Sequence, residues 1–151
     1  MAGVLDRLAP AIELAGRLLL AAIFLHEGFG KILAYTAAAS YAQAFGVPDS
    51  LLTGAIALEI GGGLCIAAGG FTRPAALSLA LFSLATAVIF HSRFAEVNQL
   101  LHFEKNLAIA GGFLILAVHG SGKWSLDALR QGRSQAGGAQ ALASGGAPGS
   151  R

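Results

Sequence analysis

Four apolar segments, each close to the length of a membrane span, constrain the fold of this chain more than any other feature. They cover approximately residues 11–33, 51–71, 74–90 and 104–119. A helix needs about 20 apolar residues to cross the roughly 30 Å hydrocarbon core of a bilayer. The fourth segment is short, so we expect it to borrow residues from its N-terminal side or to lie tilted. The sequence therefore predicts an all-α membrane protein with four transmembrane helices.

The composition supports a membrane protein. Hydrophobic residues make up 55% of the chain and charged residues 12%, whereas soluble domains average about 25% charged residues. A cleavable signal peptide is an alternative for the first segment, because small residues follow it at 37–39. Glu27 and Lys31 interrupt that segment and three more apolar segments follow, which favours a retained span. The basic residues are scattered and give no sign of nucleic-acid binding.

Turn residues separate the four segments and predict short connections. Asp49 or Ser50 is the expected cap of the second helix, and Pro74 stands at a first-turn position of the third. Short connections make sequential helices antiparallel neighbours in a four-helix bundle. Residues 131–151 are rich in Gly, Ala and Ser without a periodic apolar face. We therefore expect a membrane domain at 1–130 and a disordered tail at 131–151.

The distribution of Lys and Arg predicts the orientation in the membrane. With four spans, both termini lie on the same side as seven basic residues: Arg7, Arg17, Arg73, Lys123, Arg130, Arg133 and Arg151. The opposite side has only Lys31, Arg93 and Lys105. Basic residues concentrate on the cytoplasmic side of membrane proteins. The sequence therefore predicts a multi-pass protein of the bacterial inner membrane with both termini in the cytoplasm and the Lys31 side outside.

The first helix carries a polar seam. Glu13, Arg17, Glu27 and Lys31 fall within an arc of roughly 80° when successive residues are turned by 100°. A charge facing the centre of the lipid would cost about 2.5–3.5 kcal/mol. We therefore expect the seam to face the bundle interior, with His26 outside the arc.

Further polar residues are expected at the depth of Glu27. Glu59 lies on a small-residue face of the second helix, which also contains Gly62 and Gly63 and lets another helix approach closely. In an antiparallel bundle, the outer ends of the third and fourth helices reach the same level. The predicted constellation has five members, with His26 and Glu104 as further candidates: Glu27, Lys31, Glu59, His91 and Asn106.

This set of residues suits the handling of protons. Two carboxylates beside a histidine can exchange protons, as quinol oxidation or proton-coupled transport requires. Glu27, Glu59 and His91 are the candidate catalytic residues. Lys31, Asn106 and His26 are candidates for substrate binding, with Lys31 and Asn106 positioning a carbonyl. The alternative is that the polar residues only satisfy helix ends and fix helix packing.

Other redox groups find less support in the sequence. Cys65 is the single cysteine, so the chain cannot run an internal dithiol relay. No pair of histidines stands at mid-helix on facing helices, which argues against haem. We find no HExxH motif and predict no metal site. No cofactor is firmly implied, and a quinone is the candidate ligand.

The chain resembles the DoxX family of small four-helix membrane proteins. The matching pieces are Arg17 followed by FLHEGFGK, Glu59-x-x-Gly-Gly with Gly69 and Arg73, His91, the Lys105-Asn106 pair, and HGSGKWSLDAL near the end of the domain. The resemblance extends over roughly residues 13–129. It implies an integral inner-membrane protein linked to quinone-coupled oxidoreductase complexes.

The segment after the fourth helix reads mainly as an anchor. Trp124 is placed at headgroup level, and Ser125 with Asp127 caps a short interfacial helix. Arg17 and Arg73 lie towards the same face, where either is expected to meet Asp127 or lipid phosphate.

Two classes of function remain open at this point. The first is a redox-linked membrane subunit that binds quinone or quinol in the outer half of the bundle. The second is a non-enzymatic accessory or scaffold subunit, or a small-molecule transporter. The expected partners are the lipid bilayer, a quinone, subunits of a membrane redox complex and a second copy of the chain.

Overall fold

The computed structural model describes residues 2–145, and helices are the regular structure of this range. The six helices are α1 (Ala2–Leu33), α2 (Tyr35–Ala44), α3 (Asp49–Ala68), α4 (Thr72–Phe90), α5 (Val97–His119) and α6 (Leu126–Gly145). Within the described residues, α1, α3, α4 and α5 are long and apolar enough to span a membrane. The prediction of an all-α protein with four transmembrane helices is confirmed.

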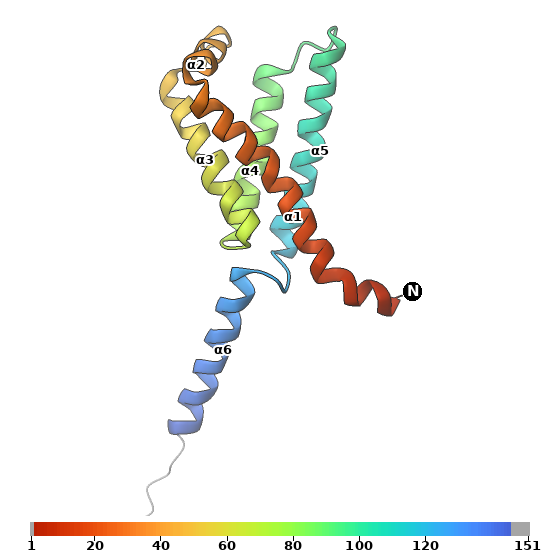
Figure 1. Ribbon diagram of the computed structural model, residues 1–151, viewed down its shortest axis with the longest axis vertical. Coiled ribbons are helices and arrows are strands. Elements are labelled where there is room, and N and C mark those ends of the chain that lie inside the picture. Colours follow the sequence, from red (N-terminus) through yellow and green to blue (C-terminus); the bar gives the residue numbers. More distant parts are fainter. Residues whose placement is uncertain (1, 146–151) are drawn as a thin grey trace, which may run out of the picture.

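The four long helices form a bundle in which each helix packs against the next along the chain. The principal contacts join α1 to α3, α3 to α4, and α4 to α5. Figure 1 shows these neighbours running in alternating directions, with α1 crossing the bundle obliquely. Helix α2 lies at one end, which we call the α2 end. Helix α6 and the start of α1 lie at the other, the α6 end (Figure 1).

The core of the bundle is built from aliphatic and aromatic side chains. Ile66, Leu79 and Phe113 are fully buried there. The Phe24 and Phe113 rings meet edge to face with their centroids 5.3 Å apart. Such packing is the main attraction between helices in a bilayer, where lipid tails are as apolar as the side chains.

The predicted small-residue face of α3 is in close contact with two other helices. A Cβ added at Gly62 would lie 3.1 Å from Leu79 Cδ1 of α4. A Cβ added at Gly63 would lie 3.0 Å from Leu25 Cδ2 of α1. Glycine at both positions therefore lets α3 pack closely between its neighbours.

Helix α2 has no counterpart in the sequence-based prediction, which treats this region as a connection. Its Ala39 is buried against Leu52 and Ile56 of α3, and Ala42 is buried as well. Alanine has the highest helix propensity and leaves room for close packing. The contact with α3 stabilises a ten-residue helix that is too short to be stable in isolation.

Two transmembrane helices are longer than predicted. Helix α1 begins at Ala2 instead of residue 11 and contains Pro10. Helix α5 begins at Val97 instead of residue 104 and has 23 residues. This length is sufficient for a full span, so the shortness of the fourth apolar segment is compensated by residues on its N-terminal side.

The turn predictions are partly confirmed. Pro74 lies in the first turn of α4, as expected. The N-cap of α3 is Pro48, whereas Asp49 and Ser50 already belong to the helix. Instead of capping α3, the Asp49 side chain accepts a hydrogen bond from Gln43 Nε2 at 2.8 Å. This contact depends on α2, which the sequence did not indicate.

Helix α6 differs from the disordered tail predicted from residue 131. It continues to Gly145 and extends away from the bundle (Figure 1). The Ser125 hydroxyl caps it by accepting the Ala128 N–H at 3.1 Å, and its Ala, Leu, Gln and Arg residues are good helix formers. Residues 146–151 of the predicted tail lie outside the described residues.

Candidate functional site

A cavity of about 600 Å³ lies among the helices at the α2 end. Its walls come from α1, α2, α3, α4 and α5, and most of its lining is aliphatic or aromatic, including Phe24, Phe82 and Phe90. The five members of the predicted constellation all line it: Glu27, Lys31, Glu59, His91 and Asn106. The sequence-based prediction that these residues converge is confirmed.

One wall holds an ion-paired group of two carboxylates and one ammonium. Lys31 Nζ lies 2.9 Å from Glu59 Oε1 and 3.3 Å from Glu27 Oε2. Glu59 is only 3% exposed, whereas the Glu27 side chain is 53% exposed. The second oxygen of Glu59, Oε2, is buried without a hydrogen-bond partner among the described residues.

Gly28 brings this group together. A Cβ added there would lie 2.7 Å from Ile60 Cγ1 and 3.3 Å from Glu59 Cβ. The missing side chain lets α1 approach α3 closely enough for Lys31, one turn further along, to reach Glu59. Gly30, two residues further along, has nothing within 4 Å of an added Cβ. It lies on the exposed face of α1.

The other wall carries imidazole and amide groups from α4 and α5. His91 Nδ1 lies 2.8 Å from Gln99 Oε1, and the His91 ring stacks on His102 with 5.0 Å between centroids. Asn106 and Lys105 follow on α5 and also line the cavity. The sequence reasoning missed His102 as a site residue, because its contact depends on how α5 packs against the end of α4. Its spacing of four residues from Asn106 on one helix face is the signal that could have identified it.

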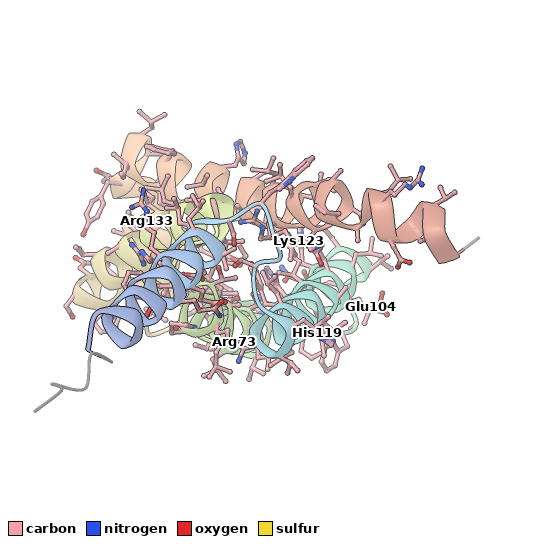
Figure 2. The ribbon with its side chains drawn as sticks, turned by 90° about the horizontal axis from the view of Figure 1, so that it is seen from below. Arg73, Glu104, His119, Lys123 and Arg133 are labelled. Atoms are coloured by element: carbon pink, nitrogen blue, oxygen red, sulfur yellow. The ribbon has the colours of Figure 1, made fainter. Side chains whose placement is uncertain are left out.

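Two further candidates do not belong to the site. His26 is exposed on α1, as its position outside the polar arc indicated, and it does not line the cavity. Glu104 is exposed on α5 and lies at the periphery of the molecule (Figure 2). Both side chains point away from the residues they were expected to join.

The polar seam of α1 divides into two clusters separated by the apolar core. At the α6 end, Arg17 is 2% exposed. Its guanidinium donates hydrogen bonds to the carbonyl oxygens of Ile66, at 3.3 Å, of Ala67, at 3.4 Å, and of Trp124. Glu13 lies against Gly122 instead of pairing with Arg17. Arg17 thus binds the last carbonyls of α3 and joins them to the segment that precedes α6.

Asp127 completes the connection at the α6 end. Its carboxylate accepts the backbone N–H groups of Phe71, at 2.9 Å, and Thr72, at 3.0 Å, at the start of α4. Although burial alone would raise the pKa of Asp127, these hydrogen bonds and the Arg130 charge together lower it below its usual value. The expected contact of Asp127 with Arg17 or Arg73 is therefore replaced by contacts with main-chain donors, which the sequence pattern does not reveal.

Arg73 contributes to a second, more open cavity of about 560 Å³ at the α6 end. Its side chain is exposed, and it lies on the same face of the molecule as His119 and Lys123 (Figure 2). Glu13 and Asp127 also line this cavity, so its charges are mixed. The prediction that Arg73 faces this end of the bundle is confirmed.

The chemistry available at the α2 end is proton exchange and hydrogen bonding. The cavity is lined by the carboxylate residue Glu59, the ammonium of Lys31, the amide residue Asn106 and the imidazole residue His91. Among the described residues, no group of three or more His, Cys, Asp or Glu side chains is arranged to hold a metal ion.

Comparisons with known proteins agree with this architecture. The DoxX family profile matches residues 12–92. The inner membrane protein YqjF of Escherichia coli is 48% identical over 116 residues, which cover 77% of this chain and 89% of that protein. The inner membrane protein YphA of Escherichia coli is 35% identical over 125 residues, or 78% and 89% of the two chains. No solved structure matches the chain. The chain therefore belongs to the DoxX family of integral inner-membrane proteins.

Proposed function

We propose that this protein is a redox-linked membrane subunit that binds a quinone or quinol in the cavity at the α2 end and exchanges protons with it. The observation that carries the proposal is that Glu59, whose buried Oε2 atom has no hydrogen-bond partner among the described residues, is one of the residues that line the cavity. A buried polar atom without a partner costs about 1–3 kcal/mol. A hydroxyl group of a bound ligand would provide the missing partner.

The remaining walls support a flat, largely apolar ligand. The cavity volume of about 600 Å³ falls within the range of about 300–1,000 Å³ typical of small-molecule sites. Phe24, Phe82 and Phe90 offer aromatic surface for a ring. Lys31 and Asn106 are the donors for a quinone carbonyl oxygen, and Glu59 Oε2 is the acceptor for a quinol hydroxyl.

Proton exchange follows from the ion-paired group. A quinol that loses two electrons also releases two protons, so the site needs two bases. Glu59 takes one proton at its free oxygen, and His91 on the opposite wall takes the other. Lys31 compensates the charge on Glu59 and connects it to Glu27, whose more exposed carboxylate leads to the surface. The electrons pass to a redox subunit of the same membrane complex.

The orientation that accompanies this proposal places both termini in the cytoplasm and the cavity in the outer half of the bundle. It is supported by the excess of Lys and Arg at the α6 end, where Arg73, Lys123 and Arg133 lie (Figure 2). Protons taken from the ligand are then released through Glu27 on the outer side.

The second candidate is a non-enzymatic accessory or scaffold subunit, or a small transporter. The observation in its favour is that Lys31 joins α1 to α3 through Glu59. A partly buried ion pair of this kind can specify how two helices pack without taking part in any reaction. In this case the polar residues hold the bundle in register.

The discriminating experiment compares Glu59→Gln with Glu104→Gln in protein purified in mild detergent. Glu59→Gln removes the base but retains the size of the side chain, while Glu104 lies outside the cavity and serves as the matched control. We expect wild-type protein and the control to retain quinone, measured by extraction and ultraviolet absorbance. With an added electron acceptor such as ferricyanide, both should support quinol-dependent proton release. Glu59→Gln should fold and abolish proton release. Wild-type protein that retains no quinone, together with loss of assembly in Glu59→Gln, would favour the accessory role.

A further inference from the structure

Helices α1 and α5 contact each other at the level of Leu20 and Gly112. At this level a Cβ added at Gly112 would lie 3.4 Å from Leu20 Cδ2, and the Phe24 and Phe113 rings meet. Nearer the α2 end, α1 leans onto α3, where Gly28 contacts Ile60. Figure 1 shows α1 and α5 separating towards this end.

The cavity lies where these two helices diverge. Ile23 and Phe24 of α1 and Asn106 and Ile109 of α5 line it from opposite sides. Phe24 lies about 14 Å along α1 from its last residue, Leu33, at a rise of about 1.5 Å per residue. The divergence therefore begins within the hydrocarbon depth of a bilayer, whose half-thickness is about 15 Å.

The end of the cavity that faces the aqueous side is covered. Ala38 and Ala42 of α2 line it there. Tyr41 of α2 stacks on Phe90 of α4 with 5.6 Å between ring centroids. The Phe45 ring, just after α2, meets Phe90 edge to face at 5.2 Å. The two sides of the cavity thus differ. Helix α2 closes the side that faces water, whereas α1 and α5 separate on the side that faces lipid.

We propose that the ligand is a membrane-dissolved molecule with a long apolar tail, and that its ring reaches Glu59 from the bilayer between α1 and α5. The tail remains in the gap between Ile23 and Ile109, and its end lies among the lipid chains. This inference rests on the proposed function, because the polar ring is taken to be the group that Glu59 and Lys31 bind. It adds the class of ligand and the route of access, and it makes Ile23 and Ile109 the residues that contact the tail.

Photolabelling tests the route directly. The probe is a benzoquinone with a decyl tail that carries a diazirine in its first half, close to the ring. The reference ligand for the binding measurement below is the same ring without a tail. After illumination in lipid nanodiscs, we expect labelled residues on the facing sides of α1 and α5, around Ile23 and Ile109. Labels on Tyr41, Phe45 or Phe90 would overturn the inference, because the tail would then leave past α2.

A pair of variants on α5 provides an independent measurement. Ile109→Trp fills the gap, whereas Leu107→Trp changes a residue that is 43% exposed and does not line the cavity. We expect Ile109→Trp to lower the binding affinity for the tailed quinone, relative to that for the tailless ring, by about tenfold. Leu107→Trp should leave this ratio of affinities unchanged. Equal losses of affinity for both ligands would refute the contact between Ile109 and the tail, but not the binding site for the ring. If wild-type protein binds neither ligand, the proposed function itself fails.

Discussion

Replacing Arg17 with methionine should loosen the α6 end of the bundle without disturbing the cavity at the α2 end. Arg17 is 2% exposed, and its guanidinium donates to three carbonyl oxygens, on Ile66, Ala67 and Trp124. Methionine retains the apolar part of the side chain and removes these donors. The segment before α6 therefore loses its connection to α3.

The expected cost follows from these contacts. A hydrogen bond from a charged donor contributes about 1.5–3 kcal/mol, which we assign to the close contact with Trp124. The two longer bonds, at 3.3 and 3.4 Å, contribute about 0.5 kcal/mol each because long bonds are weak. Relief from burying a charge offsets part of this sum. We expect the free energy of unfolding to fall by about 2 kcal/mol.

The assay is unfolding in mixed micelles, combined with hydrogen exchange of residues 121–128. The matched control is Arg7→Met. Arg7 is exposed on the same helix, and its replacement also removes one positive charge from the α6 end. We expect Arg17→Met to unfold more easily than the control and to exchange faster in this segment. If the two variants unfold within about 0.5 kcal/mol of each other, the proposed role of Arg17 is refuted.

Two further predictions concern Gly28 and Asp127. Gly28→Ala should destabilise the protein by about 1–3 kcal/mol through overpacking against Ile60 and lower quinone retention. The control Gly30→Ala, whose added Cβ meets nothing within 4 Å, should be neutral or slightly stabilising. Equal effects of the two variants on unfolding would contradict the close approach of α1 and α3. The lowered pKa of Asp127 means that its carboxylate stabilises the fold above the unfolded-state pKa of about 3.9, and that this contribution disappears as pH falls through the lower folded-state pKa. The amide NMR shifts of Phe71 and Thr72 should therefore titrate with a midpoint below that of an ordinary aspartate, and Asp127→Asn should abolish this titration; an ordinary midpoint would argue against the two hydrogen bonds.

The parts of the fold that the sequence predicts well depend on local signals. Apolar length identifies the four spans, and helical periodicity places Glu27 and Lys31 on one face. Antiparallel connection then brings Glu59 and His91 to the same depth. These steps need only the geometry of single helices and the order in which they follow one another.

The parts that it does not predict depend on packing between helices. Helix α2 is stabilised by contact with α3, and ten residues are too few to predict a stable helix without that contact. The partners of Arg17 and Asp127 are main-chain groups, which every residue carries and no pattern distinguishes. His102 joins His91 only because α5 begins at Val97 and packs beside the end of α4.

The contacts of Arg17 also have a consequence for the biosynthesis of the protein. Arg17 belongs to α1, which leaves the ribosome before α3, and its partners Ile66 and Trp124 follow 49 and 107 residues later. Until then the Arg17 side chain has none of these acceptors, and from its position at the α6 end it extends towards water and lipid headgroups. The side chain becomes buried only when the later segments arrive.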